Sequence, residues 1–189
     1  KILDNFLALD PNSKVACEVL VTTNTVIVSA EIKSTAEINF DDLIREKIKD
    51  IGYDKSDIDF DYRTCKILKF IKNQSEDIHS SIEKEKKIFQ GAGDQGIMFG
   101  YATDETESFM PLTLDLSHKI LKELSFFRKK NNQISYLRPD SKSQVTVMFD
   151  NELNPIRISS IILSTQHEQF DSDKKMLNTI KKDVLNILI

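Results

Sequence analysis

The spacing of hydrophobic residues changes from helical to strand-like within the first 33 positions. Apolar residues recur at helical intervals over residues 2–9, which predicts a short amphipathic helix. Apolar and polar residues then alternate over residues 15–22 and 25–33, and this alternation predicts two strands. Only Thr23 and Asn24 separate the two runs, and asparagine tolerates a positive φ. We therefore predict a tight β-hairpin.

The same periodicities continue to the end of the chain, and each half shows the order helix, hairpin, helix. Gly52 is placed to stop the second helix, and Ser172 to cap the last one. The expected fold class is α+β, with antiparallel or mixed sheets and helices on one face. The simplest organisation is two αβ units joined by a mobile loop at residues 72–90. The other predicted elements are helices over residues 41–51, 111–129 and after Ser172, strands over 65–71, 96–102, 145–149 and 156–164, and a polar turn over 140–143.

Composition narrows the possible partners. The 189 residues carry a formal charge of −4, without the basic excess that nucleic-acid binding requires. No apolar run approaches the roughly 20 residues that span a bilayer, and no signal peptide is visible, so we expect a cytoplasmic protein without a membrane partner. Cys17 and Cys65 are too few for the disulfide framework of a secreted domain, and both are expected to be reduced and buried.

Two glutamates interrupt the apolar strands of the first hairpin. With Thr23 and Asn24 as the turn, Glu18 and Glu31 lie diagonally on one sheet face, roughly 7–8 Å apart. One interpretation is a solvated sheet face, which the spacing alone favours. The other is a site for a cation or an ammonium group, because hard oxygen ligands suit alkali and alkaline-earth ions and an amine needs a counter-charge.

Two later segments also carry residues suited to ligand chemistry. Residues 91–96 fit G-x-G-x-x-G, but a loop precedes them and a predicted strand follows, so we reject a dinucleotide-binding Rossmann turn. Asp94 would place a negative charge where glycines allow close backbone approach. Residues 138–143 combine Lys142, suited to polyphosphate, with Asp140, suited to a nucleotide edge or a metal. An exposed entry to the second hairpin explains this segment equally well.

An ordered series of segments resembles the S-adenosylmethionine synthetase (methionine adenosyltransferase) family. The most specific is GAGDQGIMFGY at residues 91–101. The others are weak singly, but their order and spacing follow the family along nearly the whole chain. They are DPNSKVACE at 10–18, the hairpin residues Thr22-Thr23 and Glu31-Ile32, IGY at 51–53, Gln74-Ser75 with Asp77-Ile78, YLRPD at 136–140, KSQVT at 142–146 and STQH at 164–167.

The resemblance implies an α+β enzyme that forms S-adenosylmethionine from ATP and L-methionine and releases phosphate and pyrophosphate. It also implies Mg2+ at the phosphates, a K+ ion, and active sites between two subunits of a homodimer or homotetramer. On this basis residues 1–73 are most of the N-terminal synthetase domain. Residues 74–90 are then a flexible gating loop, and residues 91–189 the central synthetase domain.

Site residues are carried over from the family only at matching positions. The resemblance implies catalytic roles for Asp94, close to methionine and ribose, and for Lys142, on the phosphate side. The same-face geometry of Glu18 and Glu31 agrees with a shared site. The full implied set is Glu18 for potassium, Glu31, Gln74 and Asp94 for methionine, and Asp140, Ser141 and Lys142 for ATP.

Some positions depart from the family pattern. Asn24 and Ala30 stand where the family has glycines, Glu76 replaces a proline, and residues 79–84 differ from the gate sequence NQGVDR. The family's HPDK motif and its late glycine-rich segment would lie outside these 189 residues, so we expect this chain alone to be inactive. Two other hypotheses are a non-catalytic family member that binds a catalytic subunit, and an unrelated nucleotide-binding module.

Overall fold

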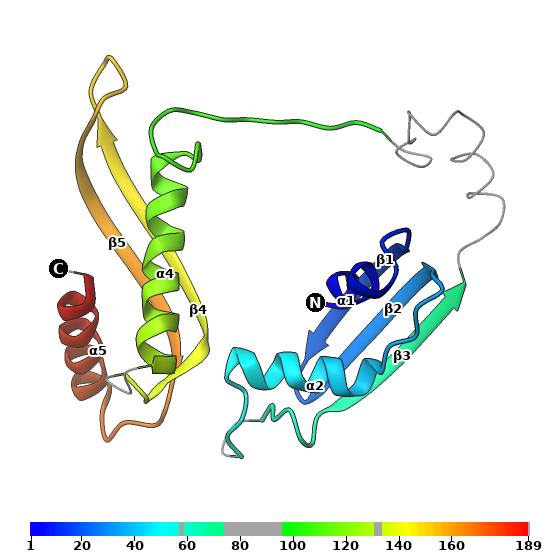
Figure 1. The fold of residues 1–189 in the computed structure, drawn as a ribbon. Coiled ribbons are helices and arrows are strands. Elements are labelled where there is room, and N and C mark those ends of the chain that lie inside the picture. The colour runs from blue at the N-terminus through cyan, green and yellow to red at the C-terminus, as the bar shows by residue number, and fades with distance from the viewer. Residues whose placement is uncertain (57–58, 74–95, 131–133, 189) are drawn as a thin grey trace. The chain divides into compact units, whose positions relative to one another are not determined.

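Two compact units make up the chain, Lys1–Phe99 and Gly100–Ile189. The structure is a computed structural model and describes residues 1–56, 59–73, 96–130 and 134–188. Each unit combines helices with a small sheet (Figure 1), which confirms the α+β fold class. The domain limits that the resemblance implies stay a prediction, because residues 74–95 lie outside the described part.

The first unit is built on the predicted hairpin. Helix α1 (Ile2–Leu9) leads into strand β1 (Lys14–Thr22), and β2 (Thr25–Lys33) pairs antiparallel to β1. Asn24 has a φ of 51°, which confirms the two-residue turn. Every residue of β1 faces the residue of β2 that this turn predicts.

A crossover helix makes the third strand parallel to the second. Helix α2 (Phe40–Ile51) is capped at its start by Asn39, whose side chain accepts hydrogen bonds from two backbone N–H groups. Gly52, with a φ of 115°, caps its end. Strand β3 (Lys66–Asn73) pairs parallel to β2, which gives the order β1-β2-β3. Residues 72–73 were predicted to lie in the loop, but they continue this ladder.

Helices α1 and α2 cover one face of this sheet. The face carries Val26 and Val28 of β2 at its centre, both fully buried. Cys65 is buried as predicted, Cys17 is half-buried, and both thiols are free. The core residues are Val26, Val28, Ile44, Ile48 and Cys65 in one cluster, and Phe6, Ala30 and Ile32 in a second.

The second unit packs two helices against a two-stranded sheet. Helix α4 (Leu112–Lys130) precedes β4 (Leu137–Phe149) and β5 (Pro155–His167), which pair antiparallel, and α5 (Asp173–Leu188) follows. The hydroxyl of Ser172 accepts a hydrogen bond from the backbone amide of Lys175 at 3.3 Å, which confirms the predicted cap. The buried core is Ile120, Leu124, Ile134, Leu137, Val145 and Val184. Among the described residues, no helix has the length and apolar character to cross a bilayer.

Two further local predictions are wrong. Residues 96–102 form no strand and pair with none of the described strands, and Phe99 is 96% exposed. A strand exists only through hydrogen bonds to a neighbour, and an apolar sequence does not supply that neighbour. Residues 140–143 form no turn, because they lie inside β4, where regular pairing with β5 resumes at Ser141 after a register irregularity that starts at Leu137.

Candidate functional site

The sheet face opposite the helices of the first unit carries both glutamates of the hairpin. Glu18 faces Ser29, and Glu31 faces Ala16, so the two carboxylates share one face at diagonal positions. This confirms the arrangement predicted from the turn. Diagonal neighbours lie roughly 7–8 Å apart. Both side chains are exposed, and neither has a hydrogen-bond or ion-pair partner in the described part of the chain.

Strand β3 brings further residues to the same face. Lys72 is the register partner of Glu31 on the opposite side from Ala16, and Phe70 is the partner of Ser29. Glu31, for which the family resemblance implies a role in methionine binding, therefore has a lysine on the adjacent strand. Sequence reasoning missed both neighbours because the parallel pairing of β3 arises through the α2 crossover. The hairpin turn sets the register of β1 and β2, but it does not determine the pairing of β3 with β2.

Apolar side chains border the carboxylates. Leu20 of β1 is 63% exposed and Phe70 of β3 is 60% exposed, and both lie on the face of the glutamates. Ile27 and Leu68 continue the row of Leu20 across the sheet, and Phe70 lies in the next row, with Ser29 and Glu18. Large apolar side chains exposed together typically mark an interaction surface.

The candidate ATP segment lies in strand β4 of the second unit. Side chains alternate along this strand, so Asp140 and Lys142 are exposed on one face and Ser141 points to the other. The Ser141 hydroxyl lies 2.8 Å from the hydroxyl of Thr165 on β5. Asp140 and Lys142 can therefore meet one ligand together, whereas Ser141 faces the side that carries α4.

Arg138, at the start of β4, is buried and lies beside a carboxylate. Its side chain is only 6% exposed, and Nη2 lies 3.3 Å from Oε1 of Glu168. A pocket of about 170 Å3 adjoins it between α4 and β4, with Ser141 and Arg128 in its wall. The interpretation of residues 138–143 as an exposed hairpin entry is wrong for Arg138 and fits only the outward residues.

Two predicted site residues, Gln74 and Asp94, lie outside the described residues. The described ones include no group of three or more His, Cys, Asp or Glu side chains that could hold a metal ion. Magnesium usually binds through one or two carboxylates together with water and the phosphates of a nucleotide, so it does not require such a group. Glu18 can offer a single hard oxygen ligand to an alkali ion.

The fold and the site define a two-unit α+β protein whose candidate ligand residues project from strands. Comparison of the sequence with known protein families identifies the class of protein more specifically. Residues 1–76 match the family described as S-adenosylmethionine synthetase, N-terminal domain, and residues 89–189 match its central domain. The chain belongs to the S-adenosylmethionine synthetase family. This membership excludes the hypothesis of an unrelated nucleotide-binding module.

Relatives named S-adenosylmethionine synthase match along the whole chain. The protein of Flavobacterium johnsoniae is 54% identical over 188 residues, and that of Cytophaga hutchinsonii is 52% identical over 188. The protein of Bacteroides fragilis is 46% identical over 200 residues. Each match covers 100% of this chain but only 45%, 45% and 46% of the respective relative. The chain thus spans slightly less than half the length of these relatives.

Proposed function

We propose that this chain carries the N-terminal and central parts of a methionine adenosyltransferase, which forms S-adenosylmethionine from ATP and L-methionine and releases phosphate and pyrophosphate. The observation that carries the proposal is the pair Glu18 and Glu31 on one open sheet face, in a chain of this family. Two carboxylates without a partner among the described residues suit cationic groups.

Each strand residue has a distinct proposed role. Glu31 accepts hydrogen bonds from the ammonium group of methionine, and Glu18 contributes an oxygen ligand to K+. Lys142 meets the triphosphate as a mobile point charge, and Asp140 on the same strand face contacts the nucleotide. Mg2+ would accompany the phosphates of ATP. The roles of Gln74 and Asp94 rest on the family resemblance alone.

The inward direction of Ser141 limits its proposed role. Its hydroxyl lies beside Thr165, on the strand face opposite to Lys142. Ser141 therefore supports the ATP segment by joining β4 to β5. The residues that bond directly to ATP are the outward ones, Asp140 and Lys142. This modifies the role that the resemblance implies.

A second subunit would complete the site. The exposed apolar side chains on the face of the glutamates, such as Leu20 and Phe70, support burial of this face in a homodimer or homotetramer. Burial at such an interface would also exclude water and strengthen the attraction of Glu31 for an ammonium group. A cytoplasmic location is part of the same proposal.

Glu31→Gln tests the proposal in a protein of the relatives' full length. The substitution keeps the shape and removes the charge, so kcat/KM for methionine should fall by about 10- to 100-fold, the effect of one charged hydrogen bond. Glu37→Gln, in the loop before α2, is the matched control and should leave kcat/KM unchanged. Unchanged kinetics in Glu31→Gln would overturn the role of Glu31.

The same measurement addresses the alternative of a non-catalytic family member. The proposed enzyme, with ATP, methionine, Mg2+ and K+, turns over steadily by itself. A wild-type protein of full length that gives no product alone, but stimulates an added catalytic subunit, would instead establish the binding-partner hypothesis.

A further inference from the structure

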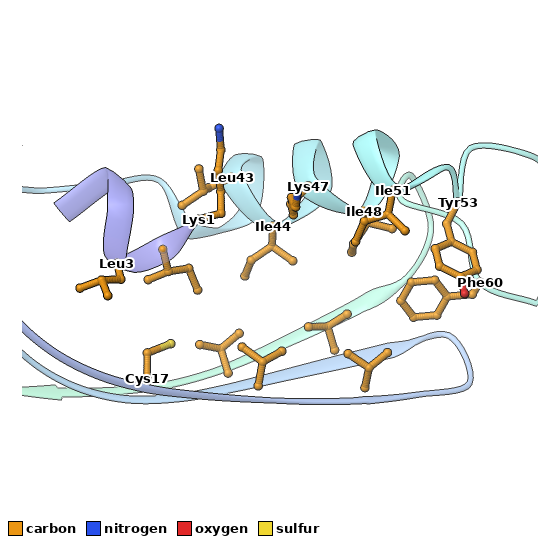
Figure 2. Close-up of a pocket in the computed structure, with 15 residues that line it drawn as sticks. Lys1, Leu3, Cys17, Leu43, Ile44, Lys47, Ile48, Ile51, Tyr53 and Phe60 are labelled. Atoms are coloured by element: carbon orange, nitrogen blue, oxygen red, sulfur yellow. The ribbon is translucent and has the colours of Figure 1, made fainter. Parts of the chain in front are cut away.

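The two faces of the first sheet differ in the charges that they present to a ligand. The face that carries the helices borders an apolar pocket of about 460 Å3, with Cys17, Ile44 and Ile48 in its wall (Figure 2). The described residues that line this pocket include the cations Lys1 and Lys47 but no carboxylate. The opposite face carries carboxylates and a lysine together, so a ligand with charges of both signs fits only there.

Glu31 and Lys72 are direct neighbours on that open face. They are register partners in the parallel strands β2 and β3, and adjacent strands lie about 4.8 Å apart. Both side chains are exposed, and within the described part of the chain neither has a hydrogen-bond or ion-pair partner. The pair therefore offers one negative and one positive group, side by side, to a molecule that lies across the two strands.

The row of Glu31 has a defined order of charge across the sheet. Ala16 of β1 lies on one side of Glu31 and Lys72 lies on the other, on a strand at the edge of the described sheet. Glu18 is diagonal to Glu31 on β1, so negative charge gathers over β1 and β2 and the positive group lies over β3. A ligand with one charge of each sign is therefore oriented with its cationic end toward β1.

The other lysines of this face are less suited to the same ligand. Lys14 and Lys33 form the next row beyond Glu31, and both already interact with other groups of the chain. Lys66 lies on β3 and on the same face as Lys72, but it is six residues, or about 20 Å, away. Lys72 is therefore the cation best placed beside Glu31.

We propose that Lys72 binds the α-carboxylate of methionine while Glu31 accepts the ammonium group of the same molecule. This inference rests on the proposed function, which assigns the ammonium group to Glu31. The two charged groups of an amino acid are attached to one carbon atom, so residues on adjacent strands can meet both at once. A lysine donates to a carboxylate as a compact charge on a flexible stem, and burial of this face in a dimer would strengthen both contacts.

A direct ion pair between Lys72 and Glu31 is the alternative role for this lysine. Methionine would then have to break the pair, and removal of Lys72 would lower KM for methionine. The described structure contains no such pair, although both residues are present in it. The two roles therefore predict opposite changes in KM.

Lys72→Met, in a protein of the relatives' full length, tests the contact. The substitution removes the charge and keeps an unbranched side chain. KM for methionine should rise about tenfold or more, the effect of one charged hydrogen bond, while KM for ATP stays unchanged. The value of kcat should also be unchanged, because the carboxylate keeps its charge throughout the reaction. Lys66→Met is the matched control on the same strand and face, and it should keep the wild-type constants.

Methionine amide isolates the contact, because it keeps the ammonium group and replaces the carboxylate by a neutral amide. The wild type should prefer methionine over the amide at least about tenfold in kcat/KM, and this preference should fall toward one in Lys72→Met. Glu31→Gln should impair both substrates, since both carry the ammonium group.

Two results would overturn the role of Lys72 and leave the proposed function intact. One is a preference for methionine over the amide that is as large in Lys72→Met as in the wild type. The other is a KM for methionine that falls in this variant. A wild-type protein that forms no product from methionine would instead contradict the proposed function, and this inference with it.

Discussion

Asp10 joins the loop after α1 to the loop after β2. Its carboxylate accepts hydrogen bonds from the backbone amide of Thr35 at 2.9 Å and from the Thr35 hydroxyl at 3.0 Å. The amide of Asn12 and the hydroxyl of Ser34 donate to it as well. These donors favour the charged form, with the Thr35 amide first, and hold the pKa of Asp10 below its ordinary value of 3.8.

The lowered pKa of Asp10 predicts an acid-dependent loss of stability. A carboxyl group with a depressed folded-state pKa stabilises the fold above its unfolded pKa, and this stability is lost as the pH falls through the folded pKa. Asp10→Asn should therefore flatten the decline of the unfolding free energy below about pH 4. Urea unfolding at a series of pH values between 7 and 2.5 measures this decline of the unfolding free energy. Asp59→Asn is the control, and a slope in Asp10→Asn equal to that of the wild type would refute the role of Asp10.

At the scale of elements, helices and turns follow local rules. Asn39 and Gly52 begin and end α2 with the side-chain cap and the positive φ that their residue types favour. Residues 96–102 have the apolar character of a strand but no strand partner, so the prediction made from them is wrong. Helix signals are carried within one segment, whereas a strand depends on a second segment elsewhere in the chain.

The cap of α5 is testable at this scale. Ser172→Ala removes the side-chain acceptor of the Lys175 amide and should lower the unfolding free energy by about 1 kcal/mol. Ser172→Asp keeps an acceptor and places a negative charge near the helix N-terminus, so it should retain the stability of the wild type. Urea unfolding monitored by circular dichroism compares the three proteins. Equal stability of the Ala and Asp variants would show that Ser172 does not cap α5.

At the scale of the whole molecule, the open face of the first sheet predicts self-association. Phe70→Asp puts a charge among the exposed apolar side chains of this face and should raise the dimer dissociation constant of a full-length protein at least about tenfold. Leu153→Asp is the control, because Leu153 is exposed in the turn between β4 and β5. Sedimentation velocity at micromolar concentration measures both variants. A Phe70→Asp protein that associates as the wild type does would exclude this face from the interface.

Much of the fold and part of the candidate site could be predicted from sequence. The two-residue turn at Asn24 was enough to place Glu18 and Glu31 on one face, because an antiparallel register follows from turn length. The turn predicted at residues 140–143 failed because polar residues also form exposed positions of a strand. The alternation of Asp140, Ser141 and Lys142 inside β4 therefore emerged only from the folded chain.

The sequence by itself determined the helices, both hairpins, the shared face of Glu18 and Glu31, and the family. Periodicity, caps and short turns are properties of neighbouring residues, and motif order is a property of the chain. Only the tertiary structure decided that β3 lies parallel to β2, which brings Lys72 beside Glu31, and that Ser141 turns away from Lys142. These relations depend on contacts between segments far apart in sequence and on the strand that each segment pairs with, which no local pattern encodes.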